Sequence, residues 1–538
     1  MTSSTADQLA PPASAGGARR DNTGAAPTWL VVAGILVVLP ALIPVLALLL
    51  RVVGASDAAW ATLASARTVQ LLLRSIFFAF VVTTAATSLG VTAAWITTRT
   101  DIRYSRTWST LLALPLVIPS YVLALSFTSF AGPRGLFADM VGIGLPSITG
   151  FWGAAVVLAL ATYPYVYLVV RATIVRIDPS LEEAARGLGS GATEAFRRIT
   201  LPQLRPSIAA SALLVALYTL SDFGAVSLMR VDVFTRVIYA QYQGRIDRTP
   251  AAVLSLMLML IAVTILWGES RSRGRSVYFA AQTPRPPTRL SLTTRQRVTT
   301  YFFLSITVGL GLALPVMVLG AWLLRGLVTG GVIDMRWGAV LGSLSGSVAA
   351  GLLAMVAAVP VAVLAVRHHG RFSRVLRTTV YAIFSLPHIA VALAVVFFAS
   401  RYLGGLYQSF LLLALVYSTL FLAQASGATE AALTQINPNL EEAARGLGDN
   451  RLNAFRRITL PLILRGLMAG GALVFLTTMK ELPATLLLRP TGFDTLAVRI
   501  WSTANELFYA RAAAPALLLL IVSAVPMYYL IIRPRHQT

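Results

Sequence analysis

One stretch of 22 residues occurs twice in this chain, 259 positions apart. The two copies, Leu181–Pro202 and Leu440–Pro461, are identical at 17 of 22 positions, and the five differences lie together in the middle. The similarity continues beyond the stretch at the same offset, so that Asp222 aligns with Glu481 and Phe234 with Phe493. A chain that repeats an element in this way is expected to fold as two similar halves.

The composition indicates a membrane protein. Of the 538 residues 57% are hydrophobic and only 12% are charged, and the mean hydropathy is +0.74. That leaves too little polar surface for a water-soluble globule. Apolar runs of about 20 residues can cross the hydrocarbon layer as helices, and we expect about twelve transmembrane helices in an all-α polytopic protein. The runs cover residues 29–51, 69–97, 108–130, 150–170, 207–229, 250–268, 301–324, 338–366, 378–400, 409–428, 466–488 and 512–532.

Four parts follow from this pattern. Residues 1–28 are rich in Ala, Ser, Gly, Pro and Thr and are expected to form a disordered cytoplasmic tail. Residues 29–268 and 301–538 form two halves of six spans each, and the polar, proline-containing residues 269–300 link them in the cytoplasm. The run 29–51 lacks a convincing cleavage site, so we interpret it as a retained span rather than a signal peptide.

The net charge of +23 reports topology rather than nucleic-acid binding, because the arginines are dispersed through short loops. If the N-terminus is inside, the cytoplasmic segments hold 29 of the 44 Lys and Arg residues, whereas the outer segments hold 14. The positive-inside rule therefore places both termini and both repeats in the cytoplasm of a cell (inner or plasma) membrane protein. Cysteine is absent, which excludes disulfides, thiolate metal sites and a cysteine nucleophile and leaves the redox compartment open.

Each repeat has the features of a short helix-turn-helix. Ser180 and Glu183 form a capping box, and the second copy has the same arrangement. The first helix should end at Gly189, where a left-handed cap favours glycine, and a second short helix should end before Pro202. Such an element could simply anchor in lipid headgroups, but its duplication favours a docking surface.

In both copies Glu-Ala-Ala is followed without a gap by three residues, Gly, nine residues and Ile-x-Leu-Pro. This pattern resembles the EAA motif of permease subunits in ABC-type importers. The resemblance implies two fused type I importer transmembrane domains, whose EAA loops (residues 178–202 and 437–461) are coupling helices that dock on two copies of a separate ABC ATPase. The residues expected to contact the ATPase are Glu182, Glu183, Ala184, Ala185 and Gly189, and Glu441, Glu442, Ala443, Ala444 and Gly448.

The chain has no G-x-x-x-x-G-K-[ST] phosphate loop, so it is not expected to hydrolyse ATP itself. ATP and Mg should bind to the partner ATPase, and no cofactor is expected in this chain. The resemblance further implies an extracytoplasmic binding protein that delivers the cargo, and alternating access driven by ATP.

Ionisable groups within spans are costly and are therefore candidates for the substrate pathway: Asp222, Lys480, Glu481 and His388. Asp222 and Glu481 should lie on facing helices near a pseudo-two-fold axis. Lys480 breaks the symmetry, since its counterpart is Ser221. Lys480 and Glu481 could form a charge-compensated pair between helices, or the carboxylates could line a path for a cation; His388 could be a packing residue, a ligand or a gate. Whether any of them binds a metal is unknown.

Four further segments resemble the fused ferric-iron (Fe3+) transport permeases: residues 114–127, 162–172, 221–230 and 480–501. The resemblance implies ferric iron as the cargo, although Pro387 and His388 stand where many relatives would have Pro-Gly. Fused permeases for thiamine, polyamine or phosphonate compounds share the architecture and remain alternatives. The sequence does not fix the chelation state of the cargo, or whether the membrane domain binds it tightly.

Two other classes of protein fit the sequence less well. An ion-coupled secondary transporter could use Asp222, Glu481 and His388 as proton relays, but the duplicated motif would then have no purpose. A membrane-embedded enzyme is disfavoured because the chain has no H-E-x-x-H pair and no convincing nucleophile elbow.

Overall fold

The computed structural model describes residues 26–54, 61, 63, 65–133, 135–177, 180–244, 246–272, 289–329, 336–368, 370–437 and 439–527. The described chain is helical, apart from one isolated β-bridge between Thr100 and Leu290. The all-α prediction is therefore confirmed. Residues 1–25, most of the predicted tail, and residues 273–288 of the predicted linker lie outside the described part.

Eight helical stretches in the described part are long and apolar enough to cross a membrane, and three bent helix pairs raise the number to as many as eleven. The last predicted run, 512–532, corresponds to helix α25 (Tyr509–Met527), whose apolar part, Tyr509–Ala524, is shorter than the eight. The bent pairs include α1 (Thr28–Val53), which contains Pro40 and Pro44 and turns by 46°.

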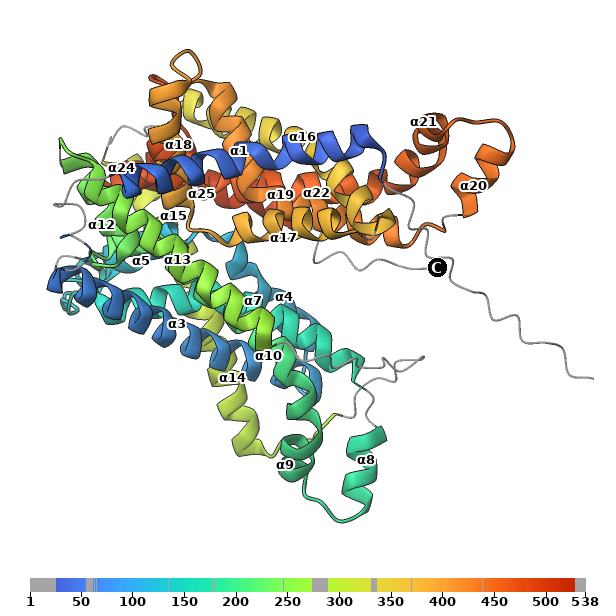
Figure 1. Ribbon diagram of the computed structural model, residues 1–538. Coiled ribbons are helices and arrows are strands. Elements are labelled where there is room, and N and C mark those ends of the chain that lie inside the picture. Colours follow the sequence, from blue (N-terminus) through green and yellow to red (C-terminus); the bar gives the residue numbers. More distant parts are fainter. Residues whose placement is uncertain are drawn as a thin grey trace, which may run out of the picture.

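Each half has a core of three long helices (Figure 1). In the first half, α3 (Ala66–Arg99), α7 (Phe151–Arg176) and α10 (Leu201–Ser221) pack together. In the second half, α16 (Trp337–Arg367), α19 (Phe410–Thr434) and α22 (Leu460–Met479) do the same. The most buried spans are α7 and α19, whereas the outer helices expose large apolar side chains that suit contact with lipid.

The first helix of each half packs across the boundary between the halves. Helix α1 contacts α16 to α19 of the second half, and α15 (Leu314–Val328) contacts α5 (Ser120–Phe130) of the first. The helices that flank the predicted linker, α13 (Thr249–Ser272) and α14 (Thr294–Val308), extend into its expected range. The crossed helices join the halves into one body.

Two predicted spans, 108–130 and 378–400, are not continuous helices. The first is α4 (Ser105–Ala113) and the 3₁₀ turn η1 (Leu114–Val117), followed after a 95° bend by α5. The second is α17 (Arg371–Ser385), followed after a 105° bend by α18 (His388–Tyr402). Both bends come at a proline, Pro119 or Pro387, because proline disfavours the helical conformation at the residue before it, and Ile118 and Leu386 are extended here.

The predicted runs 207–229 and 466–488 are also interrupted, and at equivalent places. Helix α10 ends at Ser221 and is followed by the short α11 (Gly224–Leu228), and α22 ends at Met479 and is followed by α23 (Pro483–Leu488). Hydropathy cannot detect these breaks, since the residues on both sides are apolar. In the described part of the chain each half therefore has two helices that are broken at equivalent places, in addition to the bend of α1 in the first half.

We predict that Gly90→Ala destabilises the first half. A Cβ atom at Gly90 on α3 would lie 2.6 Å from the Cβ of Val166 and 2.9 Å from the Tyr163 carbonyl oxygen on α7. Overpacking of this kind costs about 1–3 kcal/mol, so thermal unfolding in detergent should begin at a lower temperature. Gly320→Ala on α15, which has nothing within 4 Å of the added atom, is the control and should unfold like the parent. An unchanged melting temperature for Gly90→Ala would contradict this packing.

Candidate functional site

The duplicated stretch forms the same element in both halves. In the first, α8 (Ser180–Gly187) is followed by a turn, α9 (Ala192–Ala195) and the π-helical segment η2 (Phe196–Thr200), which runs into α10. In the second, the order is α20 (Asn439–Gly446), α21 (Arg451–Ala454) and η4 (Phe455–Thr459), which runs into α22. In Figure 1 α20 and α21 project beyond the bundle at the upper right, and α8 and α9 project at the bottom. The predicted helix-turn-helix is therefore present twice.

The turn depends on a glycine in each copy. Gly189 has φ +93° and Gly448 has φ +100°, a left-handed conformation that residues with a side chain rarely adopt. The amide of the following residue closes the helix: Ser190 donates to the Ala185 carbonyl, and Asp449 to that of Ala444, both at 3.1 Å. The expected helix end at Gly189 is confirmed. Pro179 and Pro438, which directly precede the two helices in the sequence, lie outside the described residues.

The first glutamate of each motif binds the chain's own transmembrane helix. In the first copy an oxygen of Glu182 lies 3.1 Å from a guanidinium nitrogen of Arg99, the last residue of α3, and it accepts a hydrogen bond from the Thr200 hydroxyl at 3.0 Å. The side chains of Arg99 and Glu182 are 4% and 13% exposed, so this ion pair is largely withdrawn from solvent. It fastens α8 to the end of α3.

The second copy repeats the arrangement more loosely. Glu441 accepts from the Thr459 hydroxyl, and it lies 3.8 Å from Arg367, the last residue of α16. The Arg367 side chain is 16% exposed and the Glu441 side chain 31%. Sequence reasoning grouped Glu182 and Glu441 with the ATPase contacts and missed both arginines. The available signal was that an arginine follows the second predicted span of each half.

The remaining motif residues form most of the exposed surface. Glu183, Ala184 and Gly189 are exposed in the first copy, as are their equivalents Glu442, Ala443 and Gly448 in the second, whereas Ala185 is half-buried and Ala444 buried. A leucine next to each glycine stands fully in the open, Leu188 at 89% and Leu447 at 90% exposure. An acidic group beside small residues and an exposed apolar side chain makes a surface suited to a protein partner.

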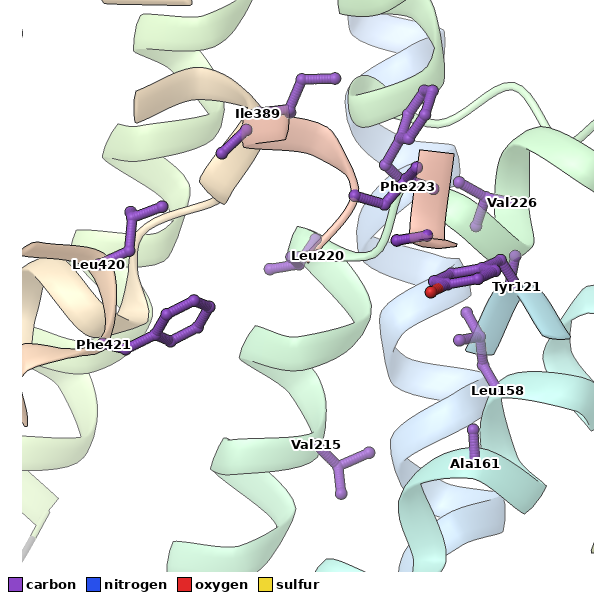
Figure 2. Close-up of a cluster of buried hydrophobic side chains, with 14 of the residues drawn as sticks. Tyr121, Leu158, Ala161, Val215, Leu220, Phe223, Val226, Ile389, Leu420 and Phe421 are labelled. Atoms are coloured by element: carbon purple, nitrogen blue, oxygen red, sulfur yellow. The ribbon is translucent and has the colours of Figure 1, made fainter. Parts of the chain in front are cut away.

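All four ionisable residues singled out within the spans line one cavity between the halves. Asp222 comes from the first half, and His388, Lys480 and Glu481 come from the second. The cavity measures about 200 Å³ and lies where the broken helices meet. Figure 2 shows a cluster of buried apolar side chains; of those it labels, Tyr121, Ala161 and Phe223 of the first half and Phe421 of the second also line the cavity.

The carboxylate of Asp222 caps one break. Asp222 follows the last residue of α10, and its Oδ1 accepts hydrogen bonds from the amides of Ala225 and Val226 at 3.0 and 3.4 Å. Its Oδ2 accepts from the hydroxyl of Ser120, the first residue of α5 after the 95° bend. One carboxylate thus joins two broken helices.

Glu481 does the same in the second half. Its Oε1 accepts from the Ala484 amide at 3.2 Å, and its Oε2 lies 2.9 Å from Nδ1 of His388, the first residue of α18 after the 105° bend. His388 and Ser120 therefore hold equivalent positions, which the sequence prediction missed because it placed His388 well inside a continuous span. The His388 ring also packs edge-on against Phe421 at 5.2 Å.

Lys480 links the two halves. Its ammonium group donates a hydrogen bond to the carbonyl of Leu116, in η1 of the first half, at 3.0 Å. A Lys480–Glu481 pair is one of the two alternatives from the sequence; in the structure Lys480 makes this bond, and Glu481 pairs with His388. Among the described residues, no three His, Cys, Asp or Glu side chains are grouped so that they could hold a metal ion.

Comparison with known proteins confirms the resemblance. The family model described as "Binding-protein-dependent transport system inner membrane component" matches residues 86–268 and 350–534. The Fe(3+)-transport system permease protein FbpB 2 of Haemophilus influenzae is 32% identical over 510 residues, which covers 94% of this chain and 98% of the relative. The sulfate transport system permease protein CysT of Salmonella typhimurium is 25% identical over 242 residues, 44% of this chain and 87% of the relative.

Each family match includes one EAA motif and one cavity carboxylate, so that the family model matches once in each half. The family is the permease component of ABC importers and not the ATPase. The chain belongs to the family of binding-protein-dependent transport system inner membrane components.

Proposed function

We propose that this permease carries ferric iron inward, with both EAA elements in the cytoplasm, each docked on one copy of an ABC ATPase, and with an extracytoplasmic binding protein at the opposite face. The observation that carries the docking role is the pair of exposed, geometrically equivalent EAA surfaces around Leu188 and Leu447. Iron is supported by the relative that matches nearly the whole chain.

The route from ATPase to cargo follows two continuous helical stretches. Phe196–Ser221 spans 26 residues and Leu452–Met479 spans 28, and each begins in an EAA element and ends beside a cavity carboxylate. A helix transmits displacement along its axis because its backbone hydrogen bonds resist extension. When the ATPase copies close, the elements move and the helices shift Asp222 and Glu481, which open or close the cavity to either side.

In this mechanism the cavity residues guide the cargo rather than store it. The carboxylates, the Lys480 ammonium and the His388 ring face one space, and their hydrogen bonds hold the broken helices in place. When either half shifts, these hydrogen bonds must break and others must form. The side chains that face the cargo are therefore the same ones that change partners in the conformational change. This coupling lets the cargo pass only when the halves move.

We expect the double variant Glu183→Ala, Glu442→Ala to lose coupling to the ATPase. Both side chains are exposed and lie outside the ion pairs that fasten the elements to α3 and α16. Loss of a charge from a protein interface commonly lowers the affinity about tenfold. Uptake into proteoliposomes that contain the complete complex should fall at least about tenfold. Glu194→Ala, an exposed glutamate on α9, is the matched control. Normal uptake by the double variant would rule out the docking role.

Arg99→Ala should act differently, because it cuts the link between α8 and α3. Removal of one partner from a buried ion pair costs about 3–5 kcal/mol, whereas Arg367→Ala should cost less, since Glu441 is more exposed and 3.8 Å away. The ATPase should still bind, but less cargo should be moved for each ATP hydrolysed. Uptake and hydrolysis measured in one preparation give this ratio, and the exchange Arg99→Glu, Glu182→Arg should restore part of it. An unchanged ratio in Arg99→Ala would contradict the linkage.

The cargo assignment is tested with vesicles that contain this chain, its ATPase and its binding protein. Ferric iron should stimulate ATP hydrolysis and accumulate inside, while thiamine, sulfate, a polyamine and a phosphonate should not. Asp222→Asn and Glu481→Gln should lower iron uptake more than they lower basal hydrolysis, because they alter the cavity and not the EAA surfaces. Stimulation by one of the other compounds, with iron inert, would refute ferric iron as the cargo and leave the docking role intact.

A further inference from the structure

A second pocket, of about 210 Å³, lies in the first half where α3, α4 and α7 meet. It is rich in groups that bind anions, with three arginines and four hydroxyl side chains and no carboxylate among its lining residues. The lining residues are Thr97, Thr98, Ser105, Arg106, Ser109, Arg171, Val175 and Arg289. None of the functions described above uses this pocket.

The arginines of this pocket lack a partner within the described chain. No described carboxylate forms an ion pair with Arg106, Arg171 or Arg289, and Nε of Arg171 is buried without a hydrogen-bond acceptor. The nearby acids are already used, since Asp101 pairs with Arg297 at 2.9 Å and Glu182 with Arg99. A buried donor without an acceptor is costly, and an acceptor from outside the chain, water or an anion, would remove that cost.

The second half provides an internal control for this interpretation. At the offset of the duplicated stretch, Arg171 aligns with Glu430. Earlier in each half the offset differs: Arg99 is equivalent to Arg367, and counting forward from these two residues without a gap aligns Ser109 with Arg377. In the second half Arg377 and Glu430 form an ion pair at 3.0 Å, and the Glu430 side chain is only 10% exposed. The second half therefore contains its own carboxylate at the place where the first half has Arg171.

Two further features favour an anion in the pocket. Ser105 and Arg106 are the first residues of the nine-residue helix α4, whose N-terminal end carries a positive electrostatic potential. Arg289 is held at the pocket by the segment before α14, because the Leu290 amide donates to the Arg99 carbonyl at 2.7 Å and the Asp101 amide to the Leu290 carbonyl at 3.2 Å. The first half and the connection between the halves thus build the pocket together.

We propose that this pocket binds a phosphate-bearing anion, either the headgroup of an anionic lipid or soluble phosphate. The anion occupies the place that Glu430 takes in the second half and neutralises Arg171 and Arg106. Thr97 and Thr98 directly precede Arg99, whose guanidinium holds Glu182 of the first EAA element. An occupied pocket therefore stabilises the end of α3 to which that element is fastened, and only one half is regulated in this way.

The test uses the purified full-length chain and the variant Arg171→Glu, which gives the first half the acidic residue of the second. The control is Arg176→Glu, which makes the same charge change on the same helix at an exposed position outside the pocket. Thermal unfolding is followed in detergent with inorganic phosphate or with chloride at equal ionic strength. It is followed again in vesicles of phosphatidylcholine with and without phosphatidylglycerol.

The proposal is supported if phosphate or phosphatidylglycerol stabilises the parent and Arg176→Glu, and if Arg171→Glu has a roughly tenfold weaker apparent affinity for the same probe. If inorganic phosphate alone gives this pattern, the ligand is soluble phosphate; if only phosphatidylglycerol gives it, the ligand is a lipid headgroup. If neither probe stabilises the parent, or if both variants respond alike, the proposal is overturned. Should Arg171→Glu fail to fold, Arg106→Gln takes its place, and Arg374→Gln, at the equivalent position of the second half, is the control. Arg106→Gln should then bind the probe more weakly, whereas Arg374→Gln should respond like the parent.

Discussion

In a lipid bilayer every backbone polar group must find its partner within the protein, and this constraint governs the whole structure. The chain satisfies it with helices nearly everywhere, and it breaks them at four equivalent places around the central cavity. At those places Asp222 and Glu481 accept the hydrogen bonds that the helices no longer provide. The cavity is therefore lined by irregular backbone that the carboxylates of Asp222 and Glu481 help to stabilise.

The same two helical stretches that end beside these carboxylates begin in the EAA elements, so that one continuous helix in each half connects an exposed EAA surface with the cavity. Glu182 and Glu441 fasten the elements to α3 and α16, whereas the side chains of the neighbouring Glu183 and Glu442 are exposed. In the proposed function the first glutamate of each pair holds the element in place, and the second contacts the ATPase.

Duplication fixed the framework of the two halves, and divergence then made them unequal. Ser120 and His388 occupy the same corner with different chemistry, and Lys480 has Ser221 as its counterpart and reaches across to Leu116. The clamp is tighter in the first half, and Arg171 replaces the acid that Glu430 provides in the second. Such differences make the two EAA elements and the two sides of the cavity chemically distinct.

The sequence alone determined the helical class, the two-fold repeat, the EAA motif and the four ionisable residues of the spans, because hydropathy and identity at a fixed offset are local properties of the chain. It did not determine the bends at Pro119 and Pro387, the exchange of α1 and α15 between halves, or the partners of Glu182 and Lys480. Those depend on contacts between residues up to 364 positions apart, and only the packed structure decides which donor meets which acceptor.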